Sequence, residues 1–293
     1  MKLYFKHYRW LPWFLMLPQL AIILIFFYWP AVQAMVQSFQ LEDMFGLSKE
    51  WVGFENFAVL FGNPIYLEAI YTTLYFSFWV TLLGLMIALF LAFFMQKIAR
   101  FITFYRTALI LPYAVSPIVV GVLWTFMFAP SFGLVSYALA KVGITWNHQL
   151  NADQAMWLVI IASIWKQISY NFLFFYAGLQ AIPKSLTEAA AIDGAGPWRR
   201  FFTIEFPLLW PTTFFLCVIN IVYVFFDTFA IIDGLTQGGP GNATSTLVYR
   251  IYFDGFKSMN YGSSAAQSVV LMGFVLILTI IQFRYIDRKG NGK

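Results

Sequence analysis

Six windows of this chain are long and apolar enough to cross a lipid bilayer as helices. A spanning helix needs about 20 residues, and inside the hydrocarbon only helices and closed barrels satisfy their own backbone polar groups. Charged residues make up 11% of the chain, whereas soluble domains carry about a quarter. The sequence therefore predicts an all-α integral membrane protein. The windows are Leu11–Val36, Ala69–Met95, Thr107–Ala129, Gln154–Gly178, Pro211–Ile232 and Ser263–Phe283.

We interpret residues 1–293 as a single transmembrane domain. The first window is not followed by a small-residue cleavage site, which favours a retained span over a signal peptide. Aromatic residues make up 21% of the chain, as is typical of proteins with aromatic belts at both membrane interfaces. The single cysteine, Cys217, excludes a disulfide framework and a thiol-based metal site. We expect no metal site.

The distribution of basic residues predicts the orientation of the chain. An even number of spans places both termini on one side, and basic residues are enriched in cytoplasmic loops. Thirteen lie on the side of the termini and of residues 179–210, against four on the other side, so we expect both termini in the cytoplasm. The thirteen are Lys2, Lys6, Arg9, Lys97, Arg100, Arg106, Lys184, Arg199, Arg200, Arg284, Arg288, Lys289 and Lys293.

The net charge of +5 is dispersed over short loops, which indicates contact with membrane lipid and not with nucleic acid.

The outer loops are acidic or rich in turn residues. Residues 37–68 carry five carboxylates, and the last outer loop contains GLTQGGPGNATS. Two interpretations stay open: solvated loops, or a landing surface for an extracytoplasmic partner.

A polar segment, residues 179–210, separates the fourth and fifth windows and has a helix–turn–helix pattern. Ser185 and Glu188 have the spacing of a capping box, which predicts a helix start. Gly194 and Gly196 permit a turn, and Pro197 suits the first position of a second helix. We expect Pro207 to end that helix before the fifth span. A compact segment of this kind predicts a docking surface.

This segment resembles the signature of ABC importer permeases. Glu188-Ala189-Ala190 is followed after three residues by Gly194, then after nine by Ile204, and then by Phe206-Pro207, where the family usually has Leu-Pro. Further stretches, LPYAVSP at 111–117 and WKQISYNFLFFYAGLQ at 165–180 among them, are similar to the sugar-type subfamily related to the maltose importer. The resemblance implies a type I ABC importer permease fold in which 179–210 is the coupling (EAA) loop. It implies that the ATPase is contacted by Glu188, Ala189, Ala190, Asp193, Gly194, Ile204 and Pro207.

The resemblance also implies a multi-pass protein of the bacterial inner membrane that works by alternating access. The expected partners are a second permease subunit in a heterodimer, two ATPase subunits that bind ATP and Mg, and an extracytoplasmic solute-binding protein. The chain has no G-x-x-x-x-G-K-[ST] run, HExxH or G-x-S-x-G, so we expect neither an enzyme nor a cofactor of its own. The likeness extends to glycerol 3-phosphate importers, which implies glycerol 3-phosphate or its diesters as solute. A neutral sugar is the alternative, and an ion-driven secondary carrier or a channel is a remote one.

Polar side chains at membrane depth are candidates for the solute pathway, because insertion scales assign about 2.5–3.5 kcal/mol to an ionised residue there. Lys166 and Tyr170 share one face of the fourth span, and Asn220, Tyr223 and Asp227 recur at helical steps in the fifth. The resemblance implies that Tyr170 lines a solute site. The candidates are Lys166, Gln167, Tyr170, Asn171, Asn220, Tyr223, Asp227 and Thr228.

Two interpretations of Lys166 remain. It either attracts an anionic solute such as a phosphate monoester, or it pairs with Asp227 and holds two helices together, which we favour slightly because an unpaired buried ammonium is costly. Pro112 and Pro117 interrupt the third window and leave carbonyls without helical partners. Such breaks are tolerated where a helix lines a cavity or packs on its neighbours.

Overall fold

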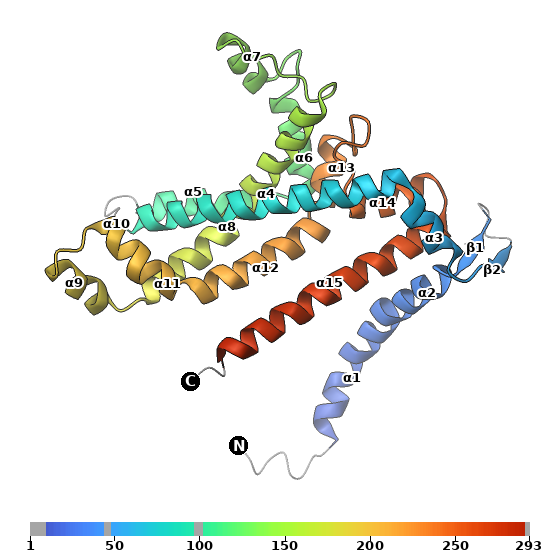
Figure 1. The fold of residues 1–293 in the computed structure, drawn as a ribbon, viewed down its shortest axis with the longest axis horizontal. Coiled ribbons are helices and arrows are strands. Elements are labelled where there is room, and N and C mark those ends of the chain that lie inside the picture. The colour runs from blue at the N-terminus through green and yellow to red at the C-terminus, as the bar shows by residue number, and fades with distance from the viewer. Residues whose placement is uncertain (1–9, 44–47, 97–101, 291–293) are drawn as a thin grey trace. The chain divides into compact units, whose positions relative to one another are not determined.

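The computed structural model describes residues 10–43, 48–96 and 102–290, and these residues are largely helical (Figure 1). They divide into two compact units, residues 1–64 with 251–293 and residues 65–250. The prediction of a single domain is not tested by this division. Of the basic residues used for orientation, Lys2, Lys6, Arg9, Lys97, Arg100 and Lys293 lie outside the described residues, so the cytoplasmic position of the termini stays a prediction.

The first unit contains one continuous helical run at its beginning and one long helix at its end. The run consists of α1 (Leu11–Ile23), the π-helix η2 (Leu24–Tyr28) and α2 (Trp29–Gln37), which match the first predicted window. A short outer segment follows with β1 (Gln40–Glu42), β2 (Lys49–Trp51) and α3 (Glu55–Gly62). The unit closes with η4 (Phe253–Lys257) and α15 (Tyr261–Gly290), and α15 packs on α2 and α3.

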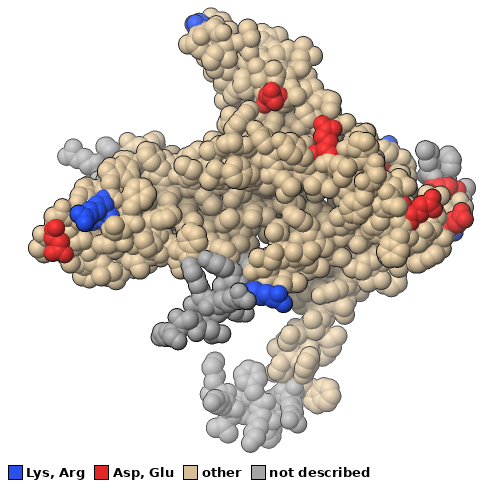
Figure 2. All heavy atoms as spheres, in the orientation of Figure 1, with Lys and Arg blue, Asp and Glu red and all other residues tan. Residues whose placement is uncertain are grey.

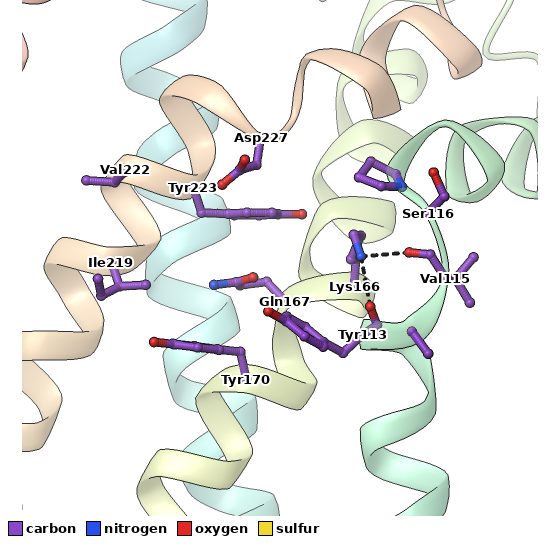
Figure 3. Close-up of a pocket in the computed structure, with 12 residues that line it drawn as sticks. Tyr113, Val115, Ser116, Lys166, Gln167, Tyr170, Ile219, Val222, Tyr223 and Asp227 are labelled. Atoms are coloured by element: carbon purple, nitrogen blue, oxygen red, sulfur yellow. Dashed lines mark hydrogen bonds between the residues drawn. The ribbon is translucent and has the colours of Figure 1, made fainter. Parts of the chain in front are cut away.

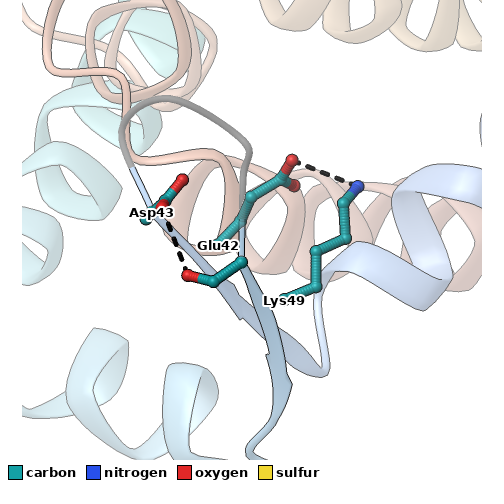
Figure 4. Close-up of polar contacts among 4 residues, drawn as sticks. Glu42, Asp43 and Lys49 are labelled. Atoms are coloured by element: carbon teal, nitrogen blue, oxygen red, sulfur yellow. Dashed lines mark hydrogen bonds and ion pairs between the residues drawn. The ribbon is translucent and has the colours of Figure 1, made fainter.

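The outer segment contains an antiparallel hairpin that the all-α prediction missed. Gln40 pairs with Trp51 and Glu42 with Lys49, and the last pair also forms an ion pair of 3.1 Å (Figure 4). The side-chain amide of Asn56 on α3 holds the hairpin in place by donating hydrogen bonds to the carbonyls of Ser38 and Gln40. Each strand has only three residues, too few to show the alternation by which a strand is recognised in sequence.

The second unit is built around the long helices α4 (Pro64–Met95) and α8 (Ala152–Ala181). Between them lie α5 (Ile102–Ala114), α6 (Pro117–Met127) and α7 (Leu134–Lys141). After α8 come α9 (Lys184–Ile192), α10 (Pro197–Arg200), the π-helix η3 (Phe201–Glu205) and α11 (Phe206–Leu208). The unit ends with α12 (Trp210–Phe226), α13 (Phe229–Leu235) and α14 (Leu247–Tyr252), which runs across the boundary between the units.

Four helical runs among the described residues are long and apolar enough to span a membrane, and there are six if each of two bent pairs counts as one span. This agrees with the six predicted windows. The third window, however, is not a straight helix. Its two halves, α5 and α6, meet at an angle of 102°. Pro117 starts α6 as its first residue, while Pro112 lies inside α5. The break follows from the missing N–H of Pro117 and the extended conformation of Ser116 before it.

The fifth window also differs from its prediction. Helix α12 ends at Phe226, so Asp227 and Thr228 lie at a break and Ile232 belongs to the next helix, α13. Pro207 does not end the preceding helix as expected. The helical run continues to Leu208 and bends by 67° only at Leu209. The turn before the proline is wound as the π-helix η3, which accommodates the missing backbone donor.

Apolar packing between α4, α8 and α12 forms the core of the second unit. Ala88 and Ala92 of α4 meet Phe172 and Phe175 of α8, with Leu216 of α12 in the same cluster. Alanine on one helix and phenylalanine on the other let the two helices interdigitate. Figure 2 shows few charged side chains on a mostly uncharged surface, as expected where lipid covers a protein.

His148, in the loop between α7 and α8, is 2% exposed. Burial lowers the pKa of this imidazole, and the backbone of Phe128 opposes the shift only in part. Because the folded pKa lies below the unfolded value of 6.5, stability is complete above that value and is lost as the pH falls below it. We expect the free energy of unfolding to fall by at most about 1.4 kcal/mol per pH unit.

Thermal unfolding of the purified protein between pH 7.5 and 5.5 tests this expectation. His148→Leu should flatten the acidic side of the profile, because it removes the titrating group. A profile that is unchanged in this variant would assign the pH dependence to other residues.

Candidate functional site

A cavity of about 530 Å³ lies in the second unit where two helix breaks face the middle of α8 (Figure 3). The α5–α6 break contributes one wall, α8 a second and the end of α12 a third. The lining residues are Tyr113, Ala114, Val115, Ser116, Pro117, Lys166, Gln167, Tyr170, Ile219, Val222, Tyr223 and Asp227. Five of the eight predicted pathway residues are among them. Their role in transport stays a prediction.

Lys166 is 8% exposed, and its ammonium is held by the α5–α6 break. Its Nζ donates to the carbonyl of Val115 at 2.7 Å and to that of Tyr113 at 3.2 Å (Figure 3). It also lies 5.4 Å from the centre of the Tyr113 ring, within reach of a cation–π interaction. The break frees these carbonyls from helical bonding, and the buried cation satisfies them.

The favoured pairing of Lys166 with Asp227 is not a direct ion pair in this structure. The two charges attract each other across the cavity, but no contact within 4.0 Å joins them. The reason is the competing pair of carbonyls at the break, which lie closer to the ammonium. The prolines predict freed carbonyls in the third window, but no local signal connects these carbonyls with Lys166, because the partners are 51 and 53 residues apart.

Asp227 is the C-cap residue of α12 and lines the cavity opposite the α5–α6 break. The prediction placed it well inside a span, whereas it lies where the helix stops. Within the described part of the chain its carboxylate has no hydrogen bond or ion pair, although its backbone N–H donates to the carbonyl of Tyr223. The side chain is exposed and lines the cavity.

Three further predicted residues line the cavity. Gln167 and Tyr170 reach it from α8, and Tyr223 reaches it from α12 (Figure 3). The Tyr223 hydroxyl donates to the carbonyl of Ser163 at 3.2 Å, which fixes its ring against α8. The Tyr170 ring stacks on Tyr113 with centres 6.3 Å apart. The cavity thus combines aromatic walls with one cation, one anion and an amide.

Asn171, Asn220 and Thr228 do not line the cavity. Asn171 and Asn220 are both fully buried and exchange two side-chain hydrogen bonds, of 3.0 and 2.7 Å, between α8 and α12. Thr228 donates to the carbonyl of Val224. Hydrogen bonds between side-chain amides join helices inside a membrane. The two asparagines therefore hold α8 and α12 together.

Helices α6 and α13, which follow the two breaks, pack tightly against each other. A Cβ atom on Gly121 of α6 would lie 2.8 Å from the carbonyl oxygen of Ile231, and one on Gly234 of α13 would lie 3.0 Å from that of Ile118. Thr125 adds hydrogen bonds from its hydroxyl to the carbonyls of Gly234 and Leu235. The two short helices therefore form one packed pair beside the cavity.

The predicted coupling loop contains two helices joined by a turn. Gly194 has a φ of +79° after the end of α9, and Pro197 is the first residue of α10, as predicted. The capping box is wrong. Helix α9 starts at Lys184 after Pro183, and no side chain caps it, because Pro183 already supplies the turn into the helix. Arg200 joins the two helices by donating to the carbonyl of Thr187.

Helix α9 is largely exposed. None of its nine residues is buried, and Ile192 at its end is 87% exposed. Glu188, Ala189, Asp193, Gly194 and Pro207 are exposed, whereas Ala190 and Ile204 are half-buried. Isolated helices shorter than about 12–15 residues are marginal in water. A nine-residue helix without a buried face is therefore suited to a partner surface.

The described residues hold no group of three or more His, Cys, Asp or Glu side chains that could bind a metal ion. That the protein binds no metal ion stays a prediction from its sequence.

This chain is similar to known membrane transport proteins. Residues 80–290 match the family model described as "binding-protein-dependent transport system inner membrane component". The chain is 56% identical over 281 residues to the sn-glycerol-3-phosphate transport system permease protein UgpA of Escherichia coli, covering 96% of this chain and 95% of that protein.

Two solved structures have a similar fold. A bacterial ABC transporter involved in the import of the acidic polysaccharide alginate matches with a TM-score of 0.80 and 26% identity, over 96% of this chain and 97% of its own. The alginate transporter in complex with an alginate pentasaccharide-bound periplasmic protein matches with 0.85 and 23% identity, over 98% of each chain. The predicted resemblance and the type I fold are confirmed.

Proposed function

We propose that this chain, which belongs to the family of binding-protein-dependent transport system inner membrane components, carries glycerol 3-phosphate or its diesters through the cavity at Lys166. The chain is a multi-pass permease subunit of an ABC importer in the inner membrane and is not itself an enzyme. The family relation leaves the secondary-carrier and channel alternatives without support.

The importer works by alternating access with partners that supply energy and solute. A solute-binding protein delivers the solute on the extracytoplasmic side, and two ATPase subunits, which bind ATP and Mg, close and open in the cytoplasm. A second permease forms a heterodimer with this chain. The exposed helix α9, followed by the turn at Gly194, supports the assignment of residues 179–210 as the coupling loop.

The observation that carries the solute assignment is the buried cation in the cavity. Insertion scales assign about 2.5–3.5 kcal/mol to an ionised lysine at membrane depth. The carbonyls of Tyr113 and Val115 are neutral acceptors, so the positive charge of Lys166 is hydrogen-bonded but has no negative group in direct contact. A phosphate monoester or diester supplies both the acceptors and the charge. A neutral sugar does not. The relatives are glycerol 3-phosphate permeases, which agrees with an anionic solute.

Replacing Lys166 with methionine tests this assignment. We expect ATP-driven uptake of glycerol 3-phosphate by the reconstituted importer to fall about 10- to 100-fold, the range for losing a hydrogen bond to a charged group. Lys166→Arg keeps the charge and should retain more of the activity. The amount of assembled complex and its basal ATP hydrolysis serve as controls for folding.

Two results would contradict the proposal. Uptake by the methionine variant at the wild-type rate would remove Lys166 from the pathway. Loss of the assembled complex in this variant, with uptake restored by arginine, would assign Lys166 a structural role at the α5–α6 break.

A further inference from the structure

Asp227 lines the proposed solute cavity, and its carboxylate attracts Lys166 without touching it. An ionised carboxylate only accepts hydrogen bonds, and no side chain or backbone group of the described residues donates one to it. Lys166, the cation of the same cavity, is already engaged by the carbonyls of Tyr113 and Val115. The donor for Asp227 must therefore come from water or from the solute.

The two charges lie on different walls of the cavity. Lys166 reaches it from α8 beside the α5–α6 break, and Asp227 reaches it from the end of α12 (Figure 3). A solute with a negative group at one end and hydroxyl groups at the other matches this arrangement in only one orientation. The reverse orientation would place phosphate against carboxylate, and like charges repel each other.

We infer that Asp227 is a specificity-determining residue that accepts hydrogen bonds from the solute's hydroxyl groups while the phosphate lies toward Lys166. This inference rests on the proposed function. It deepens that function by stating what distinguishes the solute from other phosphates. A phosphate without a hydroxyl-bearing arm leaves Asp227 unsatisfied, and inorganic phosphate is repelled by it. Sites built to bind a hydroxyl discriminate strongly against analogues that lack one.

Equilibrium binding to the assembled transporter, without its binding protein, tests this inference, because the permease is then the source of selectivity. The transporter is held with ATP and vanadate. The probes are labelled glycerol 3-phosphate and two competitors, n-propyl phosphate and inorganic phosphate. In the wild type, glycerol 3-phosphate should bind at least tenfold more tightly than n-propyl phosphate.

Asp227→Ala should reduce the affinity for glycerol 3-phosphate about 10- to 100-fold, the range for a hydrogen bond to a charged group. The affinity for n-propyl phosphate should stay the same or rise, so that the preference disappears. Asp227→Asn keeps the shape and one acceptor oxygen and should show an intermediate preference. Asp233→Asn, on α13 outside the cavity lining, removes the same charge and should keep the wild-type preference.

An equal loss of affinity for both phosphates in the alanine and asparagine variants would overturn the inference, because Asp227 would then act on structure or on charge alone. An unchanged preference would overturn it as well. Failure of the proposed function looks different: the wild-type transporter would bind none of the phosphates.

Discussion

Replacing Gly121 with valine should abolish uptake by removing the packed pair of α6 and α13. The Cβ atom would lie 2.8 Å from the Ile231 carbonyl oxygen and 3.0 Å from the Gly234 carbonyl carbon, and these are backbone atoms that no rotamer change can move. Small residues allow close helix contact in membranes, and overpacking costs about 1–3 kcal/mol and sometimes more. Since folded domains are stable by about 5–15 kcal/mol, we expect most of the protein to stay folded with a lower thermal midpoint and with α6 pushed away from α13.

The measurement is the thermal midpoint of the purified protein together with its ATP-driven uptake. Gly84→Ala is the matched control. Its Cβ atom would lie 3.6 Å from the Asn171 side chain and 3.9 Å from that of Asn220, which are ordinary contact distances. The control should keep both stability and uptake. If the valine variant at position 121 is as stable as the control, the α6–α13 contact is looser than the structure indicates.

Placing tryptophan at Ala189 should uncouple the permease from its ATPase without unfolding it. Ala189 is exposed on α9, and this helix has no buried residue, so a bulky side chain meets no part of its own chain. The bulky side chain would, however, clash with an ATPase subunit that docks on this helix. We expect uptake to fall at least about tenfold, which corresponds to a loss of about 1.4 kcal/mol in the coupled step.

Co-purification of the ATPase with the permease and ATP-driven uptake measure this effect. Ile25→Trp serves as the control, because Ile25 is exposed but lies on η2, outside the predicted coupling loop. A variant at Ala189 that retains both the ATPase and full uptake would show that α9 is not the coupling helix.

The predicted coupling loop shows how much of the backbone local sequence signals can predict. Gly194 and Pro197 act on the backbone of their own turn, so their effect could be predicted without knowing the neighbours. The capping box failed because Pro183, two residues before Ser185, sets the helix start by itself. Pro207 was misjudged for a related reason, since the preceding residues form a π-helix that tolerates the missing N–H.

The cavity shows the opposite case. Helical spacing predicted that Lys166 and Tyr170 share a face, and both line the cavity. The same reasoning could not separate Asn220 from Tyr223, since burial between α8 and α12 decides which of the two reaches open space. It also could not foresee that Asp227 lies at a helix end, because neither glycine nor proline marks that break.

The sequence by itself determined the class of protein and its spans, because the bilayer demands long apolar helices. It also located the turn at Gly194 and the helix start at Pro197, because these signals are local in the chain. Only the tertiary structure decided which groups meet in the cavity. The partners of Lys166 are backbone carbonyls 51 and 53 residues away. Carbonyls carry no side-chain signal, and their availability depends on how sharply the α5–α6 pair bends and on where α8 packs against it.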